Sequence, residues 1–466
     1  MLLEFTTGNF KCFRDEITLS LVPAHQDKNR LGNIWQGHRH NALKSAALFG
    51  PNASGKTVLL DALFVFRRFV VESATSMTQG DPIPGISPFR LDSACLERPS
   101  IFEVLVEIDG VGYHYRIEVD ETRVWRERLD YQAAEEKSRW ITLINRDTSR
   151  PQDQQARLHS RVGSQQRRQR IVDDTRTNGL LLSRAAERNV ELVMPLFDWF
   201  RNMYHSSAAL GVPHDYRHAG QLAEEAAKDE ALRQILSELV QDADTGILAL
   251  RPDEDTASGL RVSVDIESPV NVDEIVGEFR RALHNLSENR GRYGLTLFVE
   301  HAMSSGERIR FTLDDESAGT LRYLVLAGRI LSFCKTPGLM VVDELDASLH
   351  PQLARRVVQM LHSPQFNRAG AQMLFSTHDV TLMDPELLRR DQVFLAEKRP
   401  NGQSGLVSLW DFDEMPRNNA PWAKNYLLGR FGAVPVLGPR LADIPYEDSP
   451  TPPLPPETTA GALTGE

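Results

Sequence analysis

The chain has 466 residues, of which 53 are Lys or Arg and 64 are Asp or Glu, so its formal net charge is −11. This acidic balance excludes a protein that binds nucleic acid through its overall charge, and any such contact must come from a local basic patch. The three cysteines lack the paired spacing of a disulfide framework or a zinc site. Because no apolar run has the length of a membrane span and the N-terminus lacks signal-peptide features, we expect a cytoplasmic α/β protein without a membrane partner.

The first elements that we expect are a hairpin, a strand, a glycine-rich loop and a helix. Short alternating apolar stretches predict hairpin strands near residues 4–5 and 17–21. The apolar residues 45–49 predict a buried strand, and the spacing of apolar residues over 58–64 predicts a helix. The glycine-rich loop therefore lies between a strand and a helix.

That loop reads Gly-Pro-Asn-Ala-Ser-Gly-Lys-Thr, which is the pattern of a phosphate-binding loop, or P-loop. Its glycines let backbone N–H groups turn toward phosphate oxygens, and a side chain at Gly55 would block that approach. We expect Lys56 to reach the β- and γ-phosphates and Thr57 to bind Mg²⁺, while the helix presents its positive N-terminal end to the anion. The predicted ATP-binding residues of the loop are Gly50, Pro51, Asn52, Ala53, Ser54, Gly55, Lys56 and Thr57.

An antiparallel β layer is expected next. Two strongly alternating segments, 101–108 and 113–119, flank an Asp-Gly pair, which is a good hairpin signal. From about residue 135 to residue 174 the chain is polar and rich in Gln and Arg, and it ends in a cluster of Arg167, Arg168 and Arg170. Two interpretations stay open for this cluster: contact with nucleic acid, or a solvated or partner-facing helix.

Helical spacing of apolar residues returns over 180–204 and 221–242. These helices are too short for the long antiparallel coiled coil of chromosome-maintenance ATPases. A further helix is expected over 321–333, preceded by Ser317 and Gly319. This helix start is either a second anion site, one that serves a neighbouring subunit, or a plain helix cap.

Two acids follow the apolar run 339–342, as when a buried parallel strand delivers carboxylates to a nucleotide site. We expect Asp343 to hold Mg²⁺, and Glu344 to orient and deprotonate an attacking water. A second buried strand, 373–376, precedes His378, whose imidazole can donate a hydrogen bond to the γ-phosphate. The alternative for His378 is a core or turn histidine.

Taken in chain order, five features resemble the ABC-type ATPase module: the loop at Gly50, the short signature at Ser317, the Asp343-Glu344 pair, the Leu345-Asp346 turn and His378. Within that class the chain resembles the RloA-like and OLD-like AAA family ATPases of bacterial anti-phage defence loci, and a PARIS-type ATPase subunit fits as well. The stretches that carry this finer resemblance are Asn9-Phe10, 86–91, 181–186 with 198–200, and 426–433.

The resemblance implies an α/β fold, an ABC-type P-loop NTPase head with an antiparallel β layer, a helical insertion and a disordered C-terminal tail. Residues 1–130 and 301–437 would form the two halves of the head, and 131–300 a mainly helical insertion that serves a partner or dimerisation. Residues 438–466, rich in Pro and acidic side chains, would form the tail.

The resemblance further implies a homodimer, or a higher homo-oligomer, with ATP and Mg²⁺ between the P-loop of one subunit and Ser317 and Gly319 of the other. It adds Asp346 to the ATP-binding residues. The signature reads Glu-Ser-Ala-Gly-Thr where transporters have Leu-Ser-Gly-Gly-Gln, and Gln79 is a weak match for the glutamine lid.

The OLD relatives carry a nuclease domain after the ATPase, whereas 466 − 378 = 88 residues follow His378 here, too few for such a domain. The acidic cluster of Asp411, Asp413 and Glu414 is interpreted as a solvated loop rather than a metal site. The leading hypothesis is therefore an ATPase switch that controls a separate toxic nuclease during phage infection. The alternative is a RecF-like repair ATPase that acts directly on DNA, and a third hypothesis is a scaffold that binds ATP and hardly cleaves it.

Overall fold

The structure is a computed structural model, and it describes residues 1–135, 139–151, 154–206, 222, 225–226, 228–243, 246–252, 297–312, 315–412 and 421–435. The chain divides into a compact unit, Met1–Val434, and a C-terminal unit, Pro435–Glu466. The tail predicted from residue 438 lies outside the described residues. No helix within the described ranges is long and apolar enough to span a membrane.

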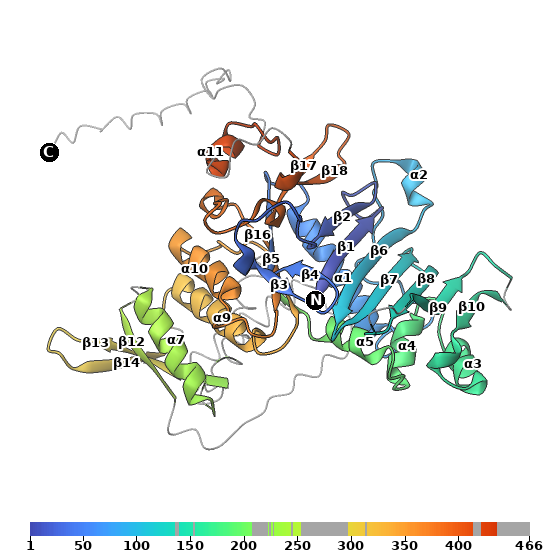
Figure 1. Cartoon of the computed structure of the whole chain (residues 1–466), viewed down its shortest axis with the longest axis horizontal. Helices are drawn as coiled ribbons and strands as arrows, with labels where there is room; N and C mark the ends of the chain where they lie inside the picture. The colour runs from blue at the N-terminus through green and yellow to red at the C-terminus, as the bar shows by residue number, and fades with distance from the viewer. Residues whose placement is uncertain are drawn as a thin grey trace, which may run out of the picture. The chain divides into compact units, whose positions relative to one another are not determined.

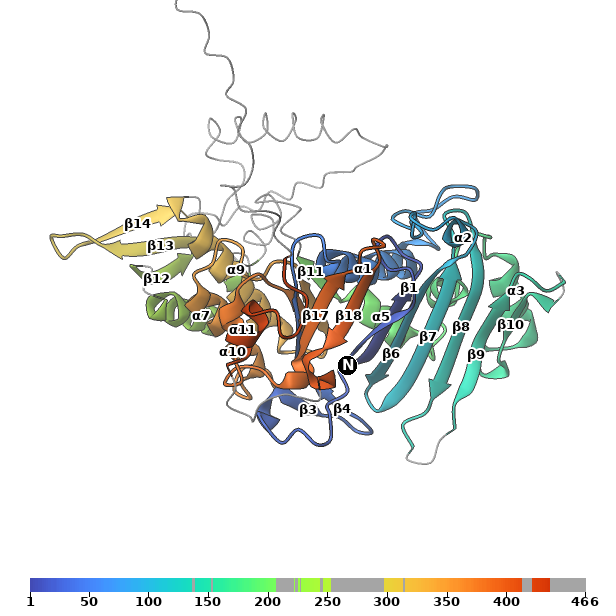
Figure 2. The same cartoon turned by 90° about the horizontal axis from the view of Figure 1, so that it is seen from above.

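A seven-stranded antiparallel sheet forms one layer of the first unit (Figure 2). The predicted opening hairpin and the predicted Asp-Gly hairpin are both part of it, and Asp109 and Gly110 have the positive φ angles, 50° and 77°, that their tight turn requires. In spatial order its strands are β10 (Ala156–Leu158), β9 (Ile141–Asp147), β8 (Val124–Gln132), β7 (Val111–Val119), β6 (Ser100–Ile108), β1 (Leu2–Gly8) and β2 (Ile17–Ser20).

A six-stranded sheet forms a second layer, and five of its strands run parallel to one another. Its central strands are fully buried apolar runs, as expected for strands covered on both faces. In spatial order its strands are β11 (Tyr204–Ser206), β15 (Leu339–Val342), β16 (Gln372–Ser376), β5 (Ser45–Phe49), β17 (Val393–Lys398) and β18 (Ser404–Ser408).

Helix α1 (Lys56–Glu72) packs between the two large sheets, and it contacts β16 on one side and β1 and β6 on the other (Figure 1). Its apolar residues join one core cluster with the inner face of the antiparallel sheet. This core also takes in α4 (Leu181–Glu187) and α5 (Met194–Arg201), which correspond to the helical spacing predicted over 180–204. The P-loop helix is thereby fixed to both layers.

Residues 131–300 were expected to be mainly helical, and their described part holds both helices and strands. Besides α4 and α5 it contains α3 (Gln165–Asp173) and α7 (Glu230–Asp242), but β9 and β10 extend the large sheet. A further sheet is antiparallel and consists of β12 (Ile247–Pro252), β13 (Leu297–Ala302) and β14 (Arg308–Thr312), with α7 against β12. A two-stranded hairpin, β3 (Ile34–Gln36) and β4 (Asn41–Leu43), completes the sheets of the described part.

Of the remaining helices, two pack with the parallel sheet. Helices α9 (Ala318–Phe333) and α10 (Pro351–His362) share a second core cluster with β15, β16 and α7. Two short helices are α2 (Ser93–Leu96) and α11 (Trp422–Leu427). The predicted α/β class, with an antiparallel β layer beside the parallel sheet that carries the P-loop, is confirmed, and the division into head and insertion stays a prediction.

Candidate nucleotide site

The P-loop leaves the C-terminal end of β5 and enters α1 at Lys56, as the sequence predicts. Gly50 has a φ of 146°, and a Cβ there would lie 2.3 Å from the carbonyl oxygen of Ala396. Gly55 has a φ of 109°, and Ala53 also adopts a left-handed conformation with a φ of 59°. Gly50 and Gly55 have backbone conformations that only glycine adopts without strain, so this loop depends on both residues.

The loop is lined by groups that suit phosphate. The Nζ atom of Lys56 is buried and donates hydrogen bonds to the carbonyl oxygens of Gly50 (2.8 Å) and Pro51 (3.1 Å). Burial lowers the pKa of Lys56, while the carboxylates of the Asp343-Glu344 segment act in the opposite direction. The Ser54 hydroxyl is buried and has no hydrogen-bond partner among the described residues. A buried ammonium and an orphaned hydroxyl at a helix N-terminus fit an anionic ligand.

Three residues from three elements meet at the carboxyl edge of the parallel sheet. Thr57 at the start of α1 donates from its hydroxyl to Oδ1 of Asp343 at 3.2 Å, and Ser376 at the end of β16 donates to the same oxygen at 2.5 Å. Asp343 is 2% exposed. Mg²⁺ in nucleotide sites takes one or two protein oxygens and fills its shell with phosphate oxygens and water. Thr57 and Asp343 therefore fit as its protein ligands.

Glu344 follows Asp343 with a backbone that few side chains adopt, a φ of 50°. Its N–H donates to the Ser376 hydroxyl at 2.8 Å, and its carbonyl oxygen accepts from Nη2 of the largely buried Arg322 at 2.8 Å. The Glu344 carboxylate is half-buried and makes no hydrogen bond or ion pair within the described residues. Since left-handed non-glycine residues gather at active sites, this backbone is consistent with a carboxylate held in place for chemistry.

His378 lies on an exposed turn directly after β16. Its backbone N–H donates to both carboxylate oxygens of Asp346, at 3.2 and 3.3 Å. The structure thus joins the turn after β15 to the turn after β16, which places Asp346 as a support for the backbone of His378. The exposed imidazole is not a core histidine, so the core alternative for His378 is wrong.

The second predicted helix start is also present. The Ser317 side chain caps α9 by accepting from the N–H of Thr320 at 3.1 Å. Gly319 lies so close to the turn after β15 that a Cβ there would be 2.6 Å from the carbonyl oxygen of Ser348. Within the described residues no hydrogen bond or ion pair joins Ser317 or Gly319 to the P-loop of the same chain.

Sequence reasoning missed the groups beside Gly55. A pocket of about 380 Å³ is lined there by Lys11, Cys12 and Lys398, together with the backbone stretch 87–91. A Cβ at Gly55 would lie 3.1 Å from the Cys12 sulfur, so the pocket adjoins the P-loop. Lys11 is paired with Asp61 at 3.1 Å, so of the two lysines it is Lys398 that adds positive charge beside the phosphate-binding loop. The only sequence signals were the Asn9-Phe10 and 86–91 stretches, which carried resemblance but no chemistry.

Arg322 and Ser376 were missed as well, since neither belongs to a recognisable pattern. The weak lid match, Gln79, is exposed, and its neighbour Thr78 accepts through its carbonyl oxygen from Nδ2 of Asn178. This contact places the segment beyond the C-terminal end of α1, whereas the P-loop lies at the N-terminal end. Gln79 therefore does not fit as the lid residue.

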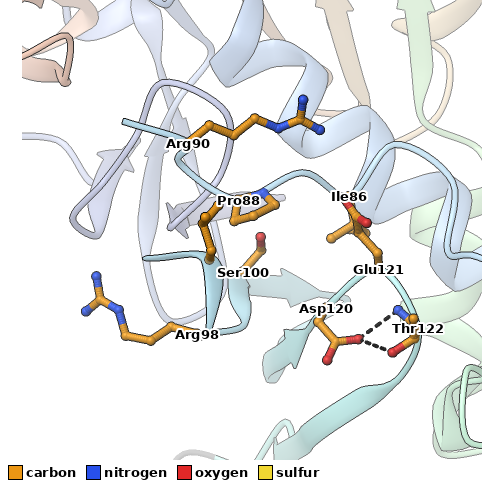
Figure 3. A pocket seen from close by; sticks show the side chains of 9 residues that line it. Ile86, Pro88, Arg90, Arg98, Ser100, Asp120, Glu121 and Thr122 are labelled. Atoms are coloured by element: carbon orange, nitrogen blue, oxygen red, sulfur yellow. Dashed lines mark hydrogen bonds between the residues drawn. The ribbon is translucent and has the colours of Figure 1, made fainter. Parts of the chain in front are cut away.

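A separate pocket of about 430 Å³ lies between the 86–90 stretch, α2 and the β7–β8 turn (Figure 3). Its acid Asp120 accepts from the N–H and from the hydroxyl of Thr122, both at 2.7 Å. It also accepts from the indole N–H of Trp125 at 2.6 Å. Asp120 therefore serves to fix the turn.

Of the acidic cluster near residue 411, only Asp411 lies within the described residues. Its carboxylate accepts from the backbone N–H of Ser408 at 3.2 Å, as part of a capped turn. No group of three or more His, Cys, Asp or Glu residues in the described part could hold a metal ion. Asp411 has a structural role in the turn.

Fold and site together define a P-loop nucleotide-binding head: the loop, a capped second helix start, two strand-end acids and a strand-end histidine occupy one α/β unit. Residues 45–384 match the model of the family described as "AAA domain, putative AbiEii toxin, Type IV TA system". The chain belongs to this AAA family.

No curated protein matches the chain. Among solved structures, the chain is similar to the SmcHead in the "Crystal structure of the SmcHead bound to the C-winged helix domain of ScpA", with 14% identity, 87% of this chain and 97% of that chain covered, and a TM-score of 0.38.

Proposed function

We propose that this protein is an ATPase whose active site is completed by a second copy of the chain. The observation that carries the proposal is the meeting of Thr57, Asp343 and Ser376, with the uncommitted carboxylate of Glu344 one residue further on. A site that only bound nucleotide would not need a second, unpaired acid at this position. The arrangement suits hydrolysis of a phosphoanhydride bond.

In the proposed reaction, Lys56 gives up its hydrogen bonds to two carbonyl oxygens of the loop and donates instead to β- and γ-phosphate oxygens. Mg²⁺ held by Thr57 and Asp343 would neutralise developing charge on the phosphates. Glu344 orients a water in line with the γ-phosphate and accepts its proton. Arg322 and Ser376 fix the backbone on both sides of Glu344, so its carboxylate needs little reorganisation.

The capped start of α9 is the feature that supports a dimer. Ser317 and Gly319 form an anion-binding helix N-terminus that contacts the turn at Ser348 rather than the P-loop of its own chain. In a head-to-tail dimer, this helix start would contact the γ-phosphate held by the other subunit, and His378 would donate to the same phosphate. ATP binding would then close the dimer and hydrolysis would open it.

A cycle of this kind suits a switch in anti-phage defence that restrains and releases a separate toxic effector, a nuclease. Support comes from the family description, which names a putative toxin of a toxin–antitoxin system. Expression with the neighbouring genes, followed by purification of this chain, tests the idea. A copurifying nuclease released by ATP turnover supports it, and the absence of any stable partner contradicts it.

Replacement of Glu344 tests the chemistry. Glu344→Gln should retain ATP binding and lose hydrolysis by about a hundredfold or more, since the water loses its base. Glu97→Gln, an exposed acid outside the site, is the matched control and should hydrolyse ATP normally. Normal turnover by Glu344→Gln would show that the base is assigned wrongly.

A second candidate, an ATPase that acts directly on DNA, is favoured by one observation. Arg157, Arg161 and Arg170 are exposed near the β10 edge and make no ion pair within the described residues. Arg167 and Arg168, in contrast, donate to backbone carbonyl oxygens and are part of the fold. Salt-sensitive DNA binding that is lost when the three free arginines are replaced, together with DNA-stimulated ATP turnover, would favour this candidate over the switch.

A further inference from the structure

The small sheet that precedes the signature carries an excess of positive charge. Glu300 on β13 is 6% exposed and is the shared partner of three arginines. Its carboxylate pairs with Arg251 (3.2 Å), Arg308 (3.2 Å) and Arg310 (3.4 Å), whose side chains are 47%, 58% and 52% exposed. One carboxylate cannot neutralise three guanidinium groups, so this cluster of four described residues keeps a net charge of about two positive charges.

The outer strand of the same sheet is an open edge. Strand β14 pairs with β13 on one side, and no strand lies on its other side in the described part (Figure 2). Within the described residues, the backbone groups of β14 on that side have no strand partner, although the N–H of Thr312 donates to Asp315. Arg308 and Arg310 point to one face, whereas Ile309 and Phe311, 39% and 37% exposed, alternate with them on the other.

This edge is connected to the signature by hydrogen bonds. At the end of β14, both the N–H and the hydroxyl of Thr312 donate to the carboxylate of Asp315, at 3.0 and 2.8 Å. On β13, the His301 ring lies 2.6 Å from the Glu316 carboxylate and packs edge-on against Phe311. Glu316 directly precedes Ser317, the cap of α9. These hydrogen bonds connect β14 to the signature through only a few residues.

We propose that β14 is a docking edge for an extended acidic segment of a partner protein. The segment adds as a further strand and thereby alters the position of the signature at Ser317. Its acidic side chains would lie opposite Arg308 and Arg310, and its apolar ones opposite Ile309 and Phe311. The alternation of cationic and apolar side chains favours a protein strand over a phosphate backbone, which would leave the apolar face exposed. This inference rests on the proposed ATPase switch and names where its partner binds.

The test uses a fluorescein-labelled peptide in which Glu and Val alternate, added to the full chain. Fluorescence anisotropy should show saturable binding, and a peptide with Lys in place of Glu should not bind. Arg308→Gln with Arg310→Gln should weaken binding by about tenfold or more, because both charge partners are lost. Glutamine still reaches Glu300, so the sheet should persist, and circular dichroism and ATP binding verify this.

The matched control replaces two exposed cations outside the edge and the nucleotide site, Lys28→Gln with Arg139→Gln. This variant has the same net charge and should bind the peptide within about twofold of the wild type. Equal loss in both variants would mean non-specific charge attraction and would overturn the proposal. Displacement of the peptide by a short single-stranded oligonucleotide, with tighter binding of that oligonucleotide, would also overturn it and assign the edge to nucleic acid.

The connection to the signature is measured separately. The peptide should change the rate of ATP hydrolysis in the wild type, and Thr312→Val should bind the peptide normally but show a smaller change. A chain that hydrolyses ATP as a dimer and binds no peptide refutes the docking edge alone. A chain that binds the peptide and never hydrolyses ATP refutes the ATPase proposal and leaves the edge standing.

Discussion

At the scale of single residues, the nucleotide site depends on backbone conformations that the surrounding structure imposes. Glu344 adopts its left-handed backbone because Ser376 holds its N–H and Arg322 holds its carbonyl oxygen. Such a conformation costs a non-glycine residue about 1–2 kcal/mol. The cost is offset by two hydrogen bonds, one of them from a charged donor. The backbone thus orients the Glu344 carboxylate, which itself makes no hydrogen bond or ion pair within the described residues.

A buried histidine at the opposite edge of the parallel sheet gives a prediction for pH. His362 ends α10, its ring nitrogen lies 2.9 Å from the hydroxyl of Ser45 at the start of β5, and Lys44 donates to its carbonyl oxygen. Burial, with a smaller contribution from the nearby Lys44 charge, lowers the pKa of His362 to about 3. The unfolded chain takes up this proton below about pH 6.5 and the folded chain does not, so stability falls as pH drops toward 3.

Between about pH 7.5 and about pH 5, this one group should lower the free energy of unfolding by about 2 kcal/mol. In His362→Gln, whose amide can still bond Ser45, that part of the drop should vanish. Denaturant unfolding of both proteins at the two pH values measures it. The same drop in the variant and the wild type would show that His362 is not buried in its neutral form.

At the scale of elements, the close approach of two active-site segments gives a second prediction. The first turn of α9 touches the turn after β15, where a Cβ on Gly319 would lie 2.6 Å from the carbonyl oxygen of Ser348. Gly319→Ala should therefore displace the helix start or the turn, although alanine itself favours a helix. We expect weaker ATP-dependent dimerisation, measured by analytical ultracentrifugation, with ATP binding to the P-loop retained.

The control for this variant is Gly32→Ala, where a Cβ meets nothing within 4 Å. It should dimerise as the wild type does. If Gly319→Ala also dimerises normally, the contact with Ser348 is not part of the proposed interface.

Local signals in the sequence predicted those elements that local residues determine. The strand β5, helix α1, the β6–β7 hairpin with its Asp109-Gly110 turn, strand β15 and the capped start of α9 all follow from periodicity or turn chemistry within a few residues. Strands β9 and β10 were missed, because the polar Gln- and Arg-rich stretch around them lacks a clear alternating pattern. They form because β8 offers an edge to pair with.

The site residues likewise divide into those that a local motif predicts and those that it does not. Lys56, Thr57 and Asp343 were predicted, because each belongs to a motif with a fixed spacing. Arg322 and Ser376 were not, since their contacts with Glu344 join residues 22 and 32 positions apart. Such contacts depend on the order of strands in the sheet, which no local pattern encodes. The division into head and insertion stays a prediction.

At the scale of the whole molecule, each chain of the proposed ATPase holds two half-sites. The P-loop half comprises Lys56, Thr57, Asp343 and Glu344, and the signature half comprises Ser317 and Gly319. If this is right, a subunit that has lost only the P-loop half still carries an intact signature half, and the converse holds as well. The two defects should then complement each other across an interface.

Mixing two inactive variants tests this claim most directly. Lys56→Ala destroys the P-loop half and Ser317→Arg blocks the signature half, so each alone should hydrolyse no ATP. In a mixed dimer one of the two sites regains an intact P-loop and an intact signature, and an equimolar mixture should recover about a quarter of the wild-type turnover if subunits pair at random. No recovery, despite mixed dimers detected by differently tagged chains, would contradict the shared site and show that each chain works alone.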